Sequence, residues 1–475
     1  MTRQRLIAIL LLVGTTAGCA VGPNYRPPAT PTGATSPLVS VRPALESIAQ
    51  PPDDWWRLYD DPELDGLVQR AFAANADLAV AQANLGVARA SLEAARNGRY
   101  PQTTTSAGAV YGRDPTAEEI VELGGRPPFT LWAFDDVLDV SYELDLFGHV
   151  RRSVEAARAD TEASIAARDA VKITVAAETT RAYADICALG EQLAVARHSL
   201  EIVTREAEIT QRRHDAGAGS EFDVVRTEEF VAQTRSAIPP LEGQRRAAVF
   251  QLAAMLGQTP AEAPPEVEAC VTPPRLAKLM PVGDGVGLLK RRPDVRLADR
   301  QLAAATARIG VATAELYPRI SLTGFYGGGA PSISALGAES GLVWGVGPTV
   351  TWSFPNMAGP LAKVHGAKAG AAAALAGFDS AVLQALKETE QALSTYGGEL
   401  DHHQALADAQ AEAQRALDIA HGQYVAGSLS TLDLLTSEQA LVAADAAVAA
   451  SDAALTQDQI AVFKALGGGW EGSPG

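Results

Sequence analysis

The chain has 475 residues, of which 56 are acidic and 39 are basic, so its formal net charge is −17. A surface this acidic has no electrostatic basis for binding phosphate backbones, which argues against a nucleic-acid-binding protein. Three cysteines exclude a disulfide-rich scaffold, and aromatic residues, at 6%, are sparse for a large globular core. Alanine and glycine dominate the apolar residues instead, which favours closely packed helices.

The first 18 residues have the pattern of an export signal. Two arginines precede an apolar run over residues 6–13, and small residues follow up to Cys19. The run is too short to span a bilayer in the mature protein. The sequence Thr16-Ala17-Gly18-Cys19 resembles a bacterial lipobox, in which Cys19 takes lipid and becomes the mature N-terminus. Because Ala20 follows rather than an aspartate, this resemblance implies the outer membrane. The alternative is an ordinary secretory signal with an incidental cysteine.

The two ends of the mature chain have the composition of irregular segments. Residues 19–52 are rich in proline, serine and threonine and contain few large apolar side chains. This composition predicts an extended, lipid-anchored tether without regular structure. Residues 468–475 are rich in glycine, which predicts a flexible tail.

The chain between these ends contains an internal repeat, so that its two halves are similar in sequence. Residues 77–112 align with 294–329 at a constant offset of 217, and both segments contain a Tyr-Pro pair and end in glycine. Residues 217–257 align with 427–467 at an offset of 210. A period above 200 residues indicates a duplicated half-molecule rather than a short repeat unit. The predicted divisions are a first repeat over 53–257, a linker over 258–284 and a second repeat over 285–467.

Each half is predicted to contain a helical segment followed by two strands. The helical segments, 61–98 and 285–315, stop at the Tyr-Pro pairs because proline cannot continue a helix. The strand segments alternate apolar and polar side chains, most clearly over 138–146 and 342–354. Strands of about ten residues that end in aromatic side chains are typical of transmembrane barrels. For any single strand, a soluble antiparallel sheet with one wet face is the alternative.

Four such strands cannot close a membrane barrel alone. Lipid offers no hydrogen-bond partner to an open sheet edge, so a barrel must close, and about eight strands is the smallest number seen. The chain must therefore oligomerise if its strands enter a membrane. Three copies would supply twelve strands.

Long proline-free stretches predict unusually long helices in both halves. Residues 150–214 and 361–425 each span about 65 residues, which at ~1.5 Å per residue corresponds to roughly 100 Å of helix. Alanine-rich sequence of this length favours antiparallel hairpins packed as coiled coils. Turns are predicted at 217–220 and 427–430, where glycine can end one helix and Ser220 or Ser430 can cap the next.

Four motifs together resemble the TolC-like outer-membrane efflux proteins, specifically the NodT-type lipoprotein branch. They are CAVGPNY at 19–25, WWRLYDDPEL at 55–64, YELDLFG at 142–148 and the long stretch 291–322. The resemblance covers essentially the whole chain. It implies an α+β, mainly α fold with an internal two-fold repeat, in which each chain contributes four strands to a trimeric twelve-stranded outer-membrane barrel. A long periplasmic coiled-coil barrel would continue it.

The resemblance also implies a function and partners. It implies a passive exit duct of a tripartite efflux system that exports small molecules such as drugs across the outer membrane. The partners would be two further copies of the chain, a periplasmic adaptor (membrane-fusion) protein and an inner-membrane resistance-nodulation-division pump. Two alternatives stay open: a type I protein-secretion duct, and a periplasmic coiled-coil lipoprotein without a pore.

The resemblance further implies a gate near the turn of the second hairpin. In the family, helices of the second repeat bend inward there, and carboxylates from three subunits form a ring that can repel and bind cations. Asp433 matches a ring aspartate, and Leu432 matches an apolar ring residue. Thr436 stands where the family has another aspartate, so a second acidic ring is absent or built differently. The alternative for Asp433 is an acidic residue that stabilises the helix N-terminus.

The hairpin tips are the predicted contacts for the adaptor. Asp223, the first-half counterpart of Asp433, is expected to cap the outer hairpin rather than to form a gate. The predicted tip residues are Gly217, Ser220, Asp223, Gly427 and Ser430.

No catalytic motif is found in the sequence, so an enzyme is the least favoured class. There is no phosphate-binding loop and no His-Glu-x-x-His pair. His402 and His403 are adjacent on a helix and point about 100° apart, which makes a poor metal pair. We expect no metal and no cofactor other than the lipid on Cys19. Cys187 and Cys270 could pair in an oxidising periplasm, but the sequence does not show whether they are close.

Overall fold

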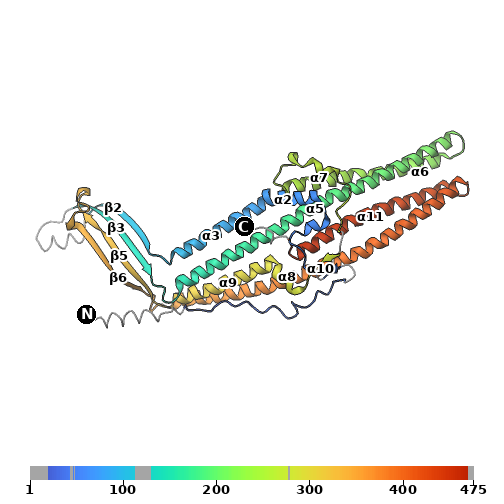
Figure 1. Ribbon diagram of the computed structural model, residues 1–475. Helices are drawn as coiled ribbons and strands as arrows, with labels where there is room; N and C mark the ends of the chain where they lie inside the picture. The colour runs from blue at the N-terminus through green and yellow to red at the C-terminus, as the bar shows by residue number, and fades with distance from the viewer. Residues whose placement is uncertain (1–19, 43–45, 48, 113–129, 277–278, 469–475) are drawn as a thin grey trace. The chain divides into compact units, whose positions relative to one another are not determined.

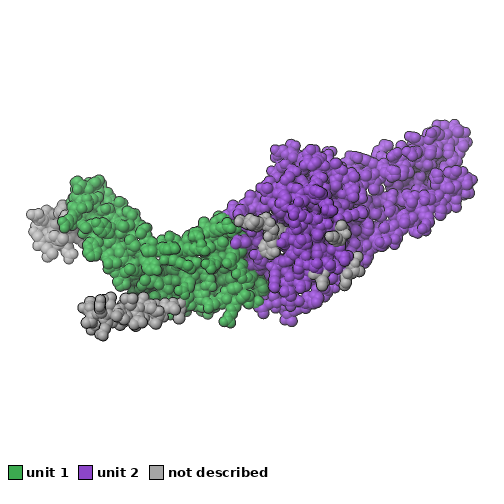
Figure 2. All heavy atoms as spheres, viewed as in Figure 1, with its two compact units in different colours: residues 1–28, 85–164, 298–378 green, residues 29–84, 165–297, 379–475 purple. Residues whose placement is uncertain are grey.

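The computed structural model describes residues 20–42, 46–47, 49–112, 130–276 and 279–468. The predicted signal, Cys19 and nearly all of the predicted tail therefore lie outside the described residues. The chain is mainly helical and forms two compact units, which Figure 2 colours separately. Each unit is built from both halves of the sequence. Unit 1 comprises 1–28, 85–164 and 298–378, and unit 2 comprises 29–84, 165–297 and 379–475.

Unit 1 contains a four-stranded antiparallel sheet with the order β2-β3-β5-β6 (Figure 1). The alternating sequence pattern explains its two faces, because residues two apart lie on the same side of a strand. Leu138 pairs with Tyr326 and Tyr142 with Leu322, so the apolar positions of neighbouring strands share one face. The strands are β2 (Gln102–Gly112), β3 (Leu131–Glu143), β5 (Arg319–Ala330) and β6 (Leu342–Thr351).

The helices that precede the strands are shorter than predicted. The first segment is divided into α2 (Pro62–Ala74) and α3 (Ala76–Asn97), and the second into α8 (Gly285–Arg291) and α9 (Pro293–Ala314). Asn75 interrupts the first segment because its Oδ1 accepts the N–H of Leu78 at 3.1 Å and so starts a new helix. Pro293 interrupts the second because it has no N–H to continue the helical ladder.

The prediction of two very long helices is confirmed. They are α5 (His149–Asp215), with 67 residues, and α10 (Ala358–Val425), with 68 residues. The returning helix of the second half, α11 (Thr431–Ala465), is continuous. In the first half, the prediction of a single long helix after the turn was wrong. The structure has two helices there, α6 (Glu221–Ser236) and α7 (Ile238–Met255), because two prolines follow Ile238.

The hydrophobic core of unit 2 joins the ends of both halves. Trp55, in the short 3-10 helix η1 (Trp55–Tyr59), is fully buried and stacks on Phe463 of α11 with ring centroids 4.9 Å apart. Trp56 donates its indole N–H to Asp65 at 2.9 Å. The WWRLYDDPEL motif is therefore a packing element. Further fully buried core residues are Leu64, Leu67, Ile186, Leu252, Leu393 and Ile460.

The proline-rich segment after Cys19 is extended as predicted, but it is held in place by contacts. In unit 2, β1 (Glu46–Ser47) pairs in parallel with β4 (Met280–Pro281) of the predicted linker. The Glu390 carboxylate accepts the backbone N–H groups of Val39 and Ser40 at 2.7 and 2.9 Å. The prediction of a tether without regular structure was therefore wrong at β1, because backbone pairing with β4 supplies partners that composition does not indicate.

Candidate functional site

The sheet of unit 1 has one polar face that carries a row of carboxylates. Asp135, Asp139 and Glu143 lie four residues apart on β3 and therefore on the same face. Asp139 stands between Thr104 of β2 and Phe325 of β5 in the ladder. The opposite face is apolar and exposed in the single chain. Its exposed members include Leu138, Tyr326, Trp344, Val346 and Val350.

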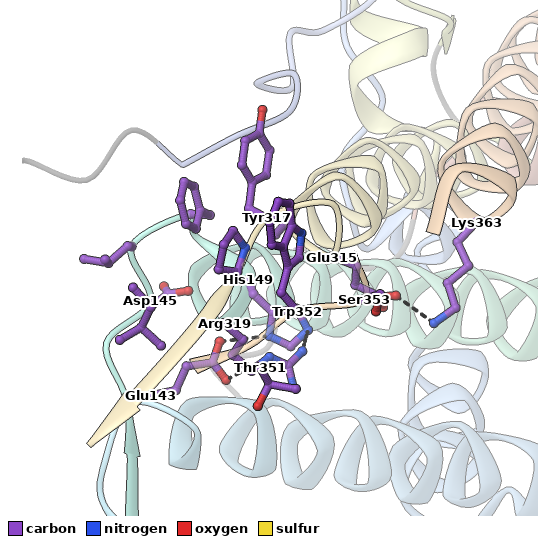
Figure 3. Close-up of a pocket in the computed structure, with 15 residues that line it drawn as sticks. Glu143, Asp145, His149, Glu315, Tyr317, Arg319, Thr351, Trp352, Ser353 and Lys363 are labelled. Carbon is purple, nitrogen blue, oxygen red and sulfur yellow. Dashed lines mark hydrogen bonds and ion pairs between the residues drawn. The ribbon is translucent and has the colours of Figure 1, made fainter. Parts of the chain in front are cut away.

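A pocket of about 360 Å³ lies in unit 1 where the strands meet the helices (Figure 3). Glu143 lies 3.5 Å from Nδ1 of His149 and 3.6 Å from Nε of Arg319. Lys363 bonds Glu315 at 2.7 Å. These contacts join the end of β3 to the start of α5 and to the start of β5, and the residue after α9 to the start of α10. The pocket is therefore a junction at which polar contacts connect neighbouring elements.

The two hairpin tips have the same local geometry. Gly217 and Gly427 have φ values of +73° and +74°, the left-handed conformation that ends a helix most cheaply at glycine. Ser220 Oγ accepts the N–H of Asp223 at 3.1 Å and donates to its carboxylate at 2.7 Å. Ser430 and Asp433 repeat this arrangement at 3.2 and 2.6 Å. The predicted serine caps are confirmed at both tips.

The candidate gate residues share the exposed side of the start of α11. Leu432 is 43% exposed, and Asp433 and Thr436 are exposed, whereas Leu434 and Leu435 are buried. Thr436 donates its hydroxyl to the carbonyl of Leu432 at 2.8 Å, so it is oriented by the helix itself. The geometry of Asp433 is that of a capping acid. Its role in a gate stays a prediction.

A buried arginine fixes the segment directly after Cys19. Arg152, 4% exposed on α5, donates to the carbonyls of Val21 and Gly22 and to Asn24 Oδ1, at 3.2, 3.2 and 2.8 Å. A Cβ on Gly22 would lie 2.5 Å from the backbone of Gly310, so the close approach requires glycine. Sequence reasoning missed Arg152. The available signal was the Gly-Pro-Asn turn in the 19–25 motif.

A second buried arginine ties three helices of unit 2 together. Arg292 is 7% exposed and donates to Asp294, Glu388 and the carbonyl of Ala465. Burial raises the pKa of Glu388 and the hydrogen bond from Arg292 lowers it, and the net shift is downward. The 291–322 motif that carried the family resemblance therefore begins at a structural ion cluster.

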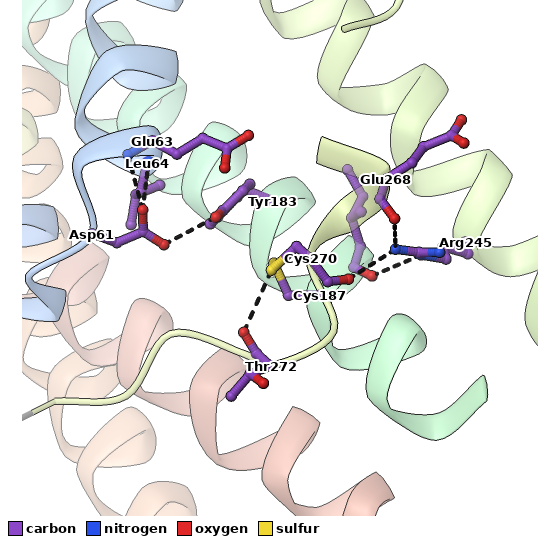
Figure 4. The surroundings of a disulfide bond; sticks show 10 residues. Asp61, Glu63, Leu64, Tyr183, Cys187, Arg245, Glu268, Cys270 and Thr272 are labelled. Carbon is purple, nitrogen blue, oxygen red and sulfur yellow. Dashed lines mark hydrogen bonds between the residues drawn. A yellow bond between two sulfur atoms is a disulfide. The ribbon is translucent and has the colours of Figure 1, made fainter. Parts of the chain in front are cut away.

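Cys187 of α5 and Cys270 form a disulfide, the pairing that the sequence left open (Figure 4). The bond attaches the segment after η3 (Pro265–Ala269) to the middle of α5. Arg245 of α7 supports this connection by donating to the carbonyls of Glu268 and Cys270 at 2.6 and 2.8 Å. A buried disulfide is typical of proteins that fold outside the reducing cytosol.

Among the described residues, no group of three or more histidine, cysteine or acidic side chains is arranged to hold a metal ion. His402 is exposed, whereas His403 Nε2 lies 3.8 Å from Asp452. The adjacent histidines therefore diverge, as their helical spacing predicts.

An amphipathic antiparallel sheet continued by long helical hairpins defines the class of outer-membrane channels with a helical extension. The family model described as outer membrane efflux protein matches residues 67–258 and 286–468, one match in each half. The chain belongs to this family. It is an outer-membrane efflux duct of the TolC-like, NodT-type branch.

Known relatives match over nearly the full chain. Nodulation protein T of Rhizobium leguminosarum bv. trifolii is 29% identical over 436 residues, which is 90% of each chain. The pyoverdine export outer membrane protein OpmQ of Pseudomonas aeruginosa is 29% identical and covers 88% of this chain and 87% of its own. The solved structure of the outer-membrane channel OprN superposes with a TM-score of 0.86 at 34% identity, covering 95% of this chain and 100% of its own.

Proposed function

We propose that three copies of this chain form the passive exit duct of a tripartite efflux system for small molecules. The observation that carries the proposal is the sheet, which has one apolar face, one polar face and two edge strands, β2 and β6. In lipid an unpaired edge is costly, and four strands are half of the smallest barrel. The edges must therefore pair with other copies.

The helices of unit 1 support this assembly, because a surface that is covered in the first half is bare in the second. At the offset of 210, small residues on α5 correspond to small residues on α10. Those on α5 are buried: Ala156, Ala159 and Ala163, each 6% exposed. Those on α10 are exposed: Gly366, Ala369 and Ala373. By length and composition α10 is apolar enough to cross a membrane, yet only 17% of its most apolar window is buried. A neighbouring copy would cover this face.

The complementary surface is also bare. In the chain, α9 covers α5, with Ala303 and Ala304 against Ala159 and with Arg308 bonded to Asp160. The α3 positions that correspond to Ala303, Ala304 and Arg308 of α9, at the offset of 217, are Gly86, Val87 and Ser91. All three are exposed, and Val87 is 67% exposed. We infer that α3 of each copy covers α10 of the next.

The internal repeat also predicts the register in which β6 of one copy would pair with β2 of the next. Tyr142 of β3 pairs with Leu322 of β5, and the corresponding residues are Trp352, directly after β6, and Thr105 of β2. Pairing β6 with β2 of the next copy in this register aligns the two apolar faces, because Thr105 shares a face with Leu138. Repeated three times, this pairing closes twelve strands with the Asp135, Asp139 and Glu143 face toward the lumen.

The remaining parts of the proposal concern the membrane anchor and partners. Lipid on Cys19 would hold the segment that Arg152 fixes to unit 1 at the outer membrane. Gly217, Ser220, Gly427 and Ser430 would contact a periplasmic adaptor, which connects the duct to an inner-membrane pump. Gly217 and Gly427 have no heavy atom within 4 Å of an added Cβ, so the tips are free for such a contact.

The test is single-channel recording from the purified, lipid-bearing protein in planar bilayers. We expect heat-resistant trimers that conduct ions, and Asp433→Ala should raise the closed-state conductance because it removes one carboxylate ring. Asp223→Ala is the matched control, since it loses the same hydrogen bond from the capping serine hydroxyl to the aspartate carboxylate at the other tip. A non-conducting monomer would refute the duct, and equal conductance of the two variants would remove Asp433 from the gate.

A further inference from the structure

Two glutamates from different helical hairpins of unit 2, one buried and one half-buried, lie near the start of α11. Glu438 of α11 is 6% exposed, and its shielded Oε2 has no hydrogen-bond partner among the described residues. Glu206 of α5 is half-buried, and its Oε1 is likewise shielded and unpartnered within the described part of the chain. A carboxylate that is buried without donors is costly, whereas a carboxylic acid can donate its own proton.

The surroundings of the pair are largely apolar. Val203 of α5, Phe230 of α6 and Leu435 of α11 form one buried cluster. Glu206 and Glu438 each follow a cluster member by three residues, so they occupy the next helical turn on the same faces. From α6 the cluster receives Phe230 and Val231, which carry no charge.

The charged groups around the pair are few. On α5, Arg213 bonds the Tyr424 hydroxyl and lies 4.9 Å from the Tyr424 ring. On α10, His421 is exposed and, with Arg213, is a basic group that acts on Glu206. Burial raises the pKa of Glu438 to about 7, with a further rise from the charge of Glu206. Burial also raises the pKa of Glu206, against the lowering effects of His421 and Arg213.

The burial of Glu438 is not a consequence of the repeat. Its first-half counterpart is Glu228, at the offset of 210, and Glu228 is exposed. Glu438 follows the candidate gate residue Asp433 by five residues on the same helix. A buried glutamate at this position is therefore found in α11 and not in α6, and it lies close to the proposed constriction.

We propose that Glu206 and Glu438 form a proton-binding site that regulates how the start of α11 docks on α5. When the pair holds one proton, it carries a single negative charge and α11 stays docked on α5. When that proton passes to water, the two carboxylates repel each other, Glu438 is charged in an apolar site, and α11 moves away from α5. Because the start of α11 carries Leu432, Asp433 and Thr436, the site couples pH to the gate.

The sign of the pH effect follows from the direction of the pKa shift. Glu438 has a pKa of about 7 in the folded chain, above its ordinary value of 4.5. The docked state therefore binds more protons than the separated state, and its stability falls as pH rises. Docking is fully stabilised below about pH 4.5, and this stabilisation is lost as pH rises through about 7.

The first experiment measures docking directly in full-length trimers in lipid vesicles. Spin labels on Arg205→Cys and Gln439→Cys, both at exposed positions, report the distance between α5 and α11. Between about pH 5.5 and about pH 8.5, on either side of the pKa of about 7, we expect this distance to increase. Glu438→Gln and Glu206→Gln should abolish the increase, because neither leaves two carboxylates. Glu228→Gln, the exposed counterpart, should behave as the unsubstituted protein does.

Conductance over the same pH range provides the second readout, and this part rests on the proposed duct. Glu438→Gln should retain, at every pH, the conductance that the unsubstituted trimer shows at low pH. A distance that stays constant with pH would overturn the proposal, as would a step that persists in Glu438→Gln and disappears in His421→Asn. A pH-dependent distance in a protein that never conducts would refute the duct and leave the proton site standing.

Discussion

The two halves of the chain share a sequence pattern but differ in how many of their contacts they satisfy internally. In the first half, α5 is covered by α9, its start is bonded by Arg152 to the N-terminal segment, and its middle is attached by Cys187 to Cys270. In the second half, the positions corresponding to Arg152 and Cys187 are Ala362 and Gly397. The second long helix, α10, therefore lacks both of these attachments, and its face that corresponds to the covered face of α5 is exposed.

This difference supports the proposal that several copies of the chain assemble. The small-residue face of α5 is covered by α9 within the chain. The corresponding face of α10 has the same kind of surface, but no helix among the described residues covers it. An open surface that copies a closed one is already complementary to the same kind of partner. In the proposed trimer, α3 and β2 of the next copy are that partner.

The largest effect is expected at the exposed face of α10, which the proposed trimer buries. Gly366→Leu should abolish the trimer while leaving the single chain folded, because nothing lies within 4 Å of an added Cβ. Leucine also has a better helix propensity than glycine, by about 1 kcal/mol. In the proposed trimer, the leucine at position 366 would clash with the neighbouring copy. At the corresponding position of α5, the space under the covering helix holds only the methyl group of Ala156. The measurement is the fraction of heat-resistant oligomer in outer-membrane extracts.

Gly243→Leu is the control for that experiment. Gly243 lies in α7 and also has open space around an added Cβ, but it belongs to no surface that the repeat pairs with another copy. Trimers should form normally in this variant. If Gly366→Leu assembles as well as Gly243→Leu does, the face of α10 is not the interface.

Local chemistry explains which parts of this architecture the sequence could predict. The left-handed glycines at 217 and 427 and the serine caps at 220 and 430 depend on neighbours within a few residues, so their patterns were readable. The break before α7 also has a local signal, the two prolines after Ile238.

Contacts between distant segments could not be predicted in the same way. Arg152 bonds Asn24, which is 128 residues away, and from sequence alone an arginine in an alanine-rich helix resembles a solvated one. Glu228 and Glu438 occupy equivalent positions with the same side chain, yet one is exposed and the other buried. Their environments differ because α5 lies against the second hairpin through Val203 and Leu435, a tertiary relation that no single segment encodes.

A smaller effect is expected at the disulfide, which only the first half of the chain contains. Replacing both Cys187 and Cys270 by alanine should destabilise the attachment of the 258–284 segment to α5 by about 2–4 kcal/mol, because the bond closes a long loop. The separation of the two cysteines in sequence is 83 residues. Limited proteolysis should then cleave within 258–284 faster, while the second-half hairpin, which has no such bond, is cleaved at its original rate. Trimers and conductance should persist. Equal acceleration in both halves would mean that the bond stabilises the whole unit rather than one attachment.

The smallest expected effect is at the tips, where the two halves are alike. Ser220→Ala and Ser430→Ala should each destabilise the following helix start by about 1 kcal/mol, because each removes one capping acceptor. Hydrogen exchange of the peptides that contain Asp223 and Asp433 measures both losses in the same sample. The two increases should be similar, since the cap distances agree within 0.1 Å. A markedly smaller increase at Asp433 would mean that contacts between copies protect the second tip, and it would extend the asymmetry of the two halves to the one region where their local structures coincide.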